Sequence, residues 1–234
     1  MILSETATRR VWDLPVRIVH WLLVLGIAGS YATHKAGIEY FRYHLWFGYL
    51  VVVLATFRLI WGVVGTRHAR FWNFLRGPGA TFRYLTGLAR GNAPAHAGHN
   101  PLGGWMVILL LLALFGQGVT GLFANDEIFN TGPLYAYLSD ESSLRLTSWH
   151  RRLFDWILVA VALHIAAVLG YWLFKKTNLI TPMFSGRKPL HAVPEHEAIS
   201  SSRLWAAALV LAGVVATLGW FVLRAPEALV SGFE

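Results

Sequence analysis

The sequence predicts an all-α membrane protein, built as a four-helix transmembrane bundle with a fifth, C-terminal transmembrane helix. Of its 234 residues, 56% are hydrophobic and only 14% are charged, whereas a soluble domain carries about 25% charged residues. The mean hydropathy is +0.50. Apolar stretches of about 20 residues can cross the ~30 Å hydrocarbon core of a bilayer as helices. Five such stretches occur, and they leave little sequence for a separate soluble domain.

The predicted spans set the domain organisation. They are Leu14–Thr33, His44–Val64, Gly103–Ala124, Trp149–Phe174 and Leu204–Leu223. We assign residues 1–188, which hold the first four spans, to one domain, and residues 189–234 to a linker and the additional helix. Before the third span, Asn100 is placed to cap a helix and Pro101 to be its first residue.

The distribution of Lys and Arg predicts the orientation in the membrane. Thirteen of the 20 lie in the N-terminal segment up to Arg17, between the second and third spans, or after the fourth, and six lie on the opposite side, counting Arg151 and Arg152 at the outer end of the fourth span. Since cytoplasmic loops carry the excess of Lys and Arg, we expect a cytoplasmic N-terminus and a periplasmic C-terminus. The net charge of +8 is thus spread over short flanking loops, and we expect no binding to nucleic acid. With no cysteine, disulfides, iron–sulfur clusters and covalently attached haem are excluded.

Four histidines lie within the spans or at their ends, where ionisable residues are costly and mark functional sites. His150 and His164 are 14 residues apart, which places them within about 40° of each other on one helix face and ~21 Å apart along the axis. Because successive spans cross in opposite directions, His20 and His164 fall in the inner half of the membrane. His44 and His150 fall near the outer surface.

These two His–His pairs predict two non-covalent b-type haems, because a helix bundle holds cofactors in its core and haem iron accepts imidazole from both sides. A zinc or proton-conducting site is the alternative, but it would bring carboxylates to the same depth, and only Asp155 is embedded in a span. A histidine that merely packs is a further alternative for each position. His34 competes with His44, since it lies 14 residues beyond His20 and near the same outer surface. We prefer His44 because it begins a continuous apolar helix.

Several cationic residues suit the anionic propionates of haem. Arg58 lies 14 residues beyond His44, at the inner level, and Arg17 either has the same role or anchors the span. Arg151 and Arg152 adjoin His150, where they would hold propionates, attract an anionic substrate or dock an acidic partner. His99 is a candidate contact for a quinone head group. Four other histidines are expected to be solvated: His68, His96, His191 and His196.

Three motifs together resemble the bacterial cytochrome b561 and nickel–iron hydrogenase b-type cytochrome subunit family. They are Trp12-Asp13-Leu14-Pro15-Val16-Arg17 followed by His20-Trp21, then His44, Gly48 and Arg58, and finally Ser148-Trp149-His150 with His164. The similarity covers roughly residues 10–188. It implies His20 and His164 as axial ligands of the inner haem and His44 and His150 of the outer one, and so favours His44 over His34. The fifth helix departs from the family pattern and brings no ligand.

The resemblance implies a bacterial inner-membrane protein that transfers electrons between the quinone pool and a redox partner, such as a hydrogenase, a dehydrogenase or a c-type cytochrome. Some short members of the family instead oxidise superoxide and reduce ubiquinone, for which Arg151 and Arg152 would guide the anion. A non-redox ion or metal transporter is the third hypothesis. The sequence assigns no catalytic residue.

Overall fold

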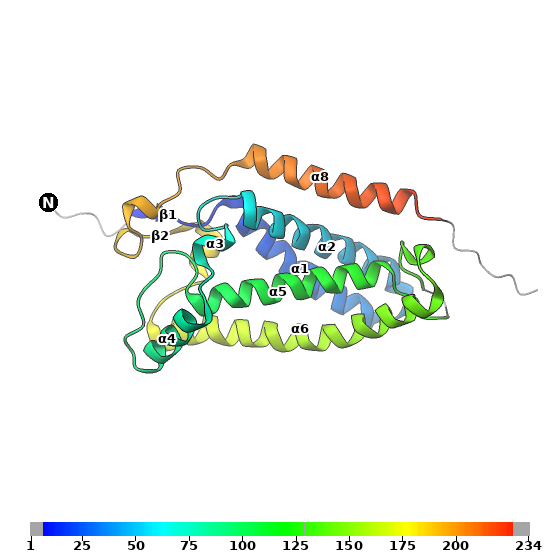
Figure 1. The fold of residues 1–234 in the computed structure, drawn as a ribbon, viewed down its shortest axis with the longest axis horizontal. Coiled ribbons are helices and arrows are strands. Elements are labelled where there is room, and N and C mark those ends of the chain that lie inside the picture. The colour runs from blue at the N-terminus through cyan, green and yellow to red at the C-terminus, as the bar shows by residue number, and fades with distance from the viewer. Residues whose placement is uncertain (1–6, 129, 227–234) are drawn as a thin grey trace, which may run out of the picture. The chain divides into compact units, whose positions relative to one another are not determined.

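The computed structural model describes residues 7–128 and 130–226. This part of the chain is mostly helical (Figure 1), and it holds five helices that are long and apolar enough to cross a membrane. They are α1 (Leu14–Ala36), α2 (Phe41–Val64), α5 (Pro101–Leu122), α6 (Asp140–Lys175) and α8 (Leu204–Leu223). The predicted fold class, a multi-pass helical membrane protein, is confirmed.

Shorter elements connect the long helices. They are β1 (Thr8–Arg10), η1 (Ile38–Tyr40), α3 (Phe71–Phe74), α4 (Pro78–Ala89), η2 (Tyr135–Tyr137), α7 (Thr181–Ser185), β2 (Arg187–Pro189), η3 (Leu190–Ala192) and η4 (Glu195–Glu197). The two strands pair antiparallel, with Thr8 opposite Pro189. Pro78 occupies the first helical turn of α4, where its missing N–H has no helical partner to lose.

Two helix starts compare differently with their predictions. The Gly103 N–H donates to the Asn100 Oδ1 over 2.8 Å, so the predicted cap of α5 is confirmed. The predicted start of the fourth span at Trp149 is wrong, because α6 begins at Asp140. Its first turns are polar, and the two acidic residues of the first turn interact favourably with the positive end of the helix dipole. A search for apolar residues alone misses such turns.

The described chain divides into two compact units. Unit 1 runs to His20 and adds Arg58–Leu110 and Ala160–Ala208, whereas unit 2 comprises Trp21–Phe57, Leu111–Val159 and the chain from Leu209 onward. Each of the five long helices contributes residues to both units.

In unit 1, a buried carboxylate joins the start of α1 to the end of α2. Asp13 is only 1% exposed. Its Oδ1 accepts the Val16 N–H over 2.7 Å, as a helix cap does. Its Oδ2 accepts the Trp61 indole N–H at 3.1 Å and the Thr66 hydroxyl at 2.5 Å. The carboxylate is therefore well supplied with donors, as a buried charge requires.

In unit 2, a hydrophobic cluster joins α2, α5 and α8. Its buried members are Val52, Leu122 and Leu134, and the side chains packed against them include Leu218 and Val222 of α8. At Gly118 a Cβ would lie 2.6 Å from the Cβ of Val52, so α5 approaches α2 more closely than any larger residue would allow. The glycine thus supports helix packing.

Candidate functional site

The structure brings the four span histidines together in two pairs, one in each unit. The ring centres of His20 and His164 lie 6.4 Å apart in unit 1, and those of His44 and His150 lie 6.3 Å apart in unit 2. Two imidazoles that bind one metal ion from opposite sides, with metal–nitrogen bonds of about 2 Å, have ring centres about 6 Å apart. Both pairs therefore have the spacing that a shared metal ion requires.

The pair in unit 2 also has the protonation pattern of metal-binding imidazoles. His44 Nδ1 lies 2.9 Å from the Ser30 carbonyl oxygen, and His150 Nδ1 lies 2.9 Å from the Gln117 carbonyl oxygen. Since a carbonyl oxygen only accepts, both Nδ1 atoms carry the proton and donate it. Metal ligands characteristically make this bond with the other ring nitrogen. The Nε2 atoms are therefore unprotonated and suited to an iron ion.

Helix α5 brings no ligand but forms a socket around the His150 ring. The Gln117 side-chain amide lies 3.1 Å from His150 Nε2 and donates to it, and the Thr120 hydroxyl lies 3.3 Å from His150 Nδ1. A Cβ at Gly121 would stand 2.8 Å from His150 Cε1. The amide thus contacts the nitrogen that an iron ion would take. The sequence analysis did not predict a role for Gln117. The chain has a single glutamine, and its position inside an apolar span could have indicated such a role.

Room for a cofactor exists beside His44. A Cβ placed on Gly48, one turn further along α2, would meet no atom within 4 Å. The competing His34 is exposed, and its ring centre lies 6.0 Å from that of His44. His44 is thus close to both histidines, and its spacing of 6.3 Å to His150 is the one that the predicted pairing needs.

The two histidine pairs suit a metal ion that is already coordinated by a cofactor. Within residues 7–128 and 130–226, no group of three or more His, Asp or Glu side chains could hold a metal ion. Each pair instead supplies two nitrogens, and porphyrin supplies the other four positions of a haem iron. The residues present therefore fit haem b.

The predicted arginines differ in their surroundings. Arg58 lies in unit 1, is 5% exposed, donates to the Ala69 carbonyl over 3.2 Å and lies 5.5 Å from the centre of the Phe71 ring. Arg17 donates to the Phe184 carbonyl, and its buried Nε has no partner in the described part of the chain. Two further predicted arginines are exposed on α6: Arg151 and Arg152.

His99 lies in an aromatic cage in unit 1. Its ring centre is 4.6 Å from that of Trp12 and 4.4 Å from that of Phe74, and its buried Nδ1 has no hydrogen-bond partner among the described residues. Burial, together with the positive charge of Arg58, lowers the pKa of His99 to about 3. The imidazole is therefore neutral, with one nitrogen able to donate and the other to accept.

One of the histidines expected to be solvated is not. His68 is 7% exposed, and its Nε2 donates to the Glu197 carbonyl over 2.8 Å. The prediction was wrong because the segment between β2 and α8 covers this ring, a long-range contact with no signal in the local sequence. His96 is half-buried, and its burial lowers its pKa. His191 and His196 are exposed as expected.

The chain is similar to known proteins over most of its length. The family described as prokaryotic cytochrome b561 matches residues 11–186, a span that includes all four paired histidines. The "Probable Ni/Fe-hydrogenase 1 B-type cytochrome subunit" of Escherichia coli (strain K12) is 25% identical over 219 residues, covering 78% of this chain and 92% of that protein. The "Probable Ni/Fe-hydrogenase B-type cytochrome subunit" of Rhizobium leguminosarum bv. viciae is 27% identical over 218 residues, covering 76% and 87%.

The family match extends over most of the chain, and the two alignments include most of the length of each relative. The fold, the apolar helices and the names of these relatives agree on a membrane b-type cytochrome that works in electron transfer. The chain belongs to the prokaryotic cytochrome b561 family.

Proposed function

We propose that the chain is a dihaem cytochrome, in which His20 and His164 hold one haem b and His44 and His150 hold the other. The observation that carries this proposal is the ring-centre distance of 6.4 Å in one pair and 6.3 Å in the other. Bound haem supplies one-electron chemistry, while the protein supplies ligation, orientation and electrostatic tuning.

The chain's own residues have three tasks at these sites. The carbonyls of Ser30 and Gln117 orient the two imidazoles of unit 2. Arg58, which is buried, and Arg17, whose Nε is buried, supply positive charge in unit 1, where propionates would be suitable anionic partners. For the haem of unit 2, this role falls to Arg151 and Arg152.

We propose quinone as the diffusible electron carrier, with its head group at His99. A neutral imidazole can donate a hydrogen bond to a quinone carbonyl, and the buried Nδ1 of His99 is available for one. The rings of Trp12 and Phe74 supply the flat apolar surface that a quinone ring requires.

The names of the relatives support a proposal for the redox partner, and the charge distribution supports one for the orientation. Because the similar proteins are named as hydrogenase cytochrome subunits, we propose a hydrogenase as the partner, with a dehydrogenase or a c-type cytochrome as the alternatives. We further propose the bacterial inner membrane, a cytoplasmic N-terminus and a periplasmic C-terminus, with residues 1–188 forming the cytochrome domain and residues 189–234 the linker and added helix.

Reduction of the purified protein by a quinol in lipid nanodiscs tests the quinone proposal. We expect quinol to reduce the protein and give the absorption spectrum of a reduced b-type cytochrome, and His99→Leu to slow this reduction about fivefold, since one hydrogen bond contributes about 1 kcal/mol. His191→Leu, at an exposed loop position, should leave the rate unchanged. Equal rates in the His99 variant and the wild type would contradict the assignment of His99.

Two further outcomes would overturn the proposed function as a whole. Steady-state reduction of quinone by superoxide, with no protein partner, would replace it by superoxide oxidation. A purified protein without a b-type spectrum after addition of haem would exclude both redox functions and favour a transporter.

A further inference from the structure

The connection between α2 and α5 is strongly basic and contains an amphipathic helix. Residues 65–100 include five arginines and no Asp or Glu. They are Arg67, Arg70, Arg76, Arg83 and Arg90. The helix α4 lies in the middle of this segment, entirely within unit 1.

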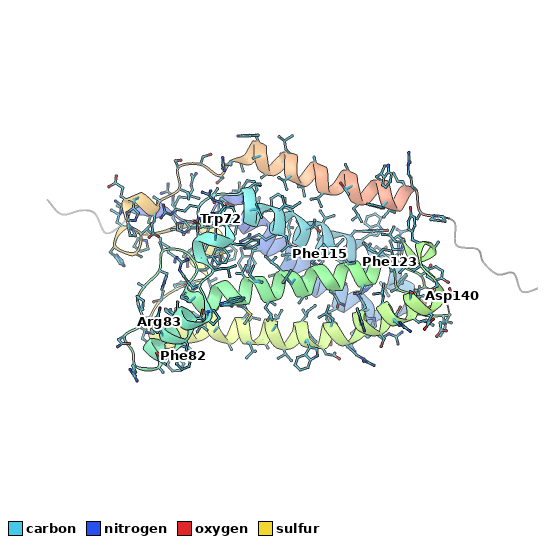
Figure 2. All side chains as sticks on the ribbon, viewed as in Figure 1. Trp72, Phe82, Arg83, Phe115, Phe123 and Asp140 are labelled. Atoms are coloured by element: carbon cyan, nitrogen blue, oxygen red, sulfur yellow. The ribbon has the colours of Figure 1, made fainter. Side chains whose placement is uncertain are left out.

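The residues of α4 separate into three faces. Tyr84 is buried and defines the anchored face. At about 100° per residue, Leu85 and Phe82 point about 100° and 160° away from it on one side, and Arg83 points about 100° away on the other. Phe82 is 66% exposed and Leu85 46% exposed, so an apolar face lies uncovered beside a basic one. Figure 2 shows Phe82 and Arg83 projecting from α4.

Two hydrogen bonds hold this segment at the ends of membrane helices. The Tyr84 hydroxyl lies 2.7 Å from the hydroxyl of Tyr171, which stands about one turn before the end of α6 at Lys175. The Trp105 indole N–H donates to the Arg76 carbonyl over 3.0 Å, and Trp105 stands about one turn after the start of α5. Both anchors therefore lie about one turn from the end of a helix that is long and apolar enough to cross a membrane, which is where a bilayer's hydrocarbon would give way to head groups.

From these observations we propose that α4 lies in the membrane interface, with Phe82 and Leu85 in the lipid and with Arg83 and the flanking Arg76 and Arg90 bound to anionic phospholipid head groups. Interfacial helices combine Phe, Leu and Trp on one face with Lys or Arg on the other. Trp72, 55% exposed in α3, adds an aromatic ring of the kind enriched at this depth. A lipid surface fits better than a protein groove, because the anchors place the apolar face level with the bilayer that already surrounds the neighbouring helices.

The absence of cysteine makes a direct test possible. A bimane fluorophore attached to Phe82→Cys in the full-length protein reports contact with lipids that carry bromine in their acyl chains. In vesicles that mix phosphatidylglycerol with phosphatidylcholine, we expect brominated lipid to quench the label, and brominated phosphatidylglycerol to quench it more than brominated phosphatidylcholine. A label on the exposed loop position His191→Cys should be quenched by neither.

Removing the charge tests the head-group contact separately. With Arg76, Arg83 and Arg90 all changed to Gln, the preference for phosphatidylglycerol should fall at least about tenfold, since each arginine near an anionic surface contributes about a fivefold preference. Quenching itself should persist. The same three-charge removal at Arg42, Arg145 and Arg224 should leave the preference at Phe82→Cys unchanged.

Three results would overturn the proposal. They are a label at residue 82 that no brominated lipid quenches, equal quenching by the two lipids in the wild-type background, and an unchanged preference after the three substitutions around α4. Because the readout does not depend on haem or electron transfer, these results are independent of the proposed function.

Discussion

At the scale of single residues, Gln117 has two opposed effects on the His150 site. Its carbonyl oxygen accepts from Nδ1 and orients the ring, whereas its side-chain amide donates to Nε2. The first contact favours iron binding because it fixes the tautomer. The second competes with iron for the same lone pair, and the Gln117 Oε1 is buried without a partner among the described residues.

Removing the amide should therefore strengthen haem binding in unit 2. For Gln117→Leu, we expect the apoprotein to bind haem at this site about fivefold more tightly, because a neutral hydrogen bond of about 1 kcal/mol no longer has to be broken. Titration of the apoprotein with haem, followed by absorption, measures the change. Thr120→Val is the matched control, since its hydroxyl lies near Nδ1 and not Nε2. Weaker binding in the leucine variant would show that the amide supports the bound state.

The buried ring of His99 predicts an acid-sensitive fold. Its pKa in the folded chain is about 3, against an ordinary value of 6.5. Between these values the unfolded chain binds a proton that the folded chain does not. Acidification therefore lowers the free energy of unfolding. The full value is present above about pH 6.5, and it falls by up to about 1.4 kcal/mol per pH unit as the pH drops towards about 3.

His99→Leu should consequently make the fall of Tm with acidification shallower. The measurement is the difference in apparent Tm between about pH 7 and about pH 4 in detergent, compared with that of the wild type. His191→Leu, at an exposed position, should retain the full pH dependence. If Tm fell equally with pH in the His99 variant and the wild type, the His99 ring of the wild type would be able to bind a proton in the folded protein, which would contradict its lowered pKa.

At the scale of elements, helices with strong apolar patterns were predictable and polar ones were not. The bounds of α8 match the predicted span, and the Asn100 cap of α5 is present. By contrast, α4 and the first turns of α6 lack a long apolar run. Tertiary contacts contribute to their stability: the Tyr84 to Tyr171 hydrogen bond holds α4, and the Ser143 hydroxyl in α6 donates to the Phe123 carbonyl. Hydropathy does not encode such contacts.

The candidate site follows the same division. Helical periodicity and alternating span direction predict the pairing of His20 with His164 and place His150 near the outer surface, because both depend only on regular geometry. The choice of His44 over His34 as its partner also needed the apolar run after His44 and the family resemblance. The socket around His150 was not predictable, since it depends on which face of α5 meets α6. The burial of His68 likewise depends on a segment 129 residues away in the sequence.

Open space beside α2 gives a prediction for this element. Gly48→Leu should fill the volume next to His44 and lower the haem content of unit 2 by more than half, while Gly213→Leu on α8 should have no such effect. Both glycines have no atom within 4 Å of a built Cβ, so the two variants differ in position and not in local crowding. Pyridine haemochrome analysis of the purified variants measures the loss. Equal haem content in the Gly48→Leu and Gly213→Leu variants would mean that the haem of unit 2 does not occupy the space beside Gly48.

At the scale of the whole molecule, the charge distribution predicts the topology. Alkaline phosphatase, which is active only in the periplasm, should be active when fused after Ala225 and inactive when fused after Ser202, before α8. The reason is that thirteen of the 20 Lys and Arg residues lie on the side predicted to be cytoplasmic. The reverse pattern of activity would invert the orientation.

The central claim for the whole molecule is that two histidine pairs hold two haems independently. The most direct measurement is the haem content per chain in the wild type, His150→Ala and His164→Ala, with His34→Ala as the control. We predict two haems in the wild type and the control, and one in each of the other variants. One haem in the wild type, or loss of both haems from either single variant, would contradict the account.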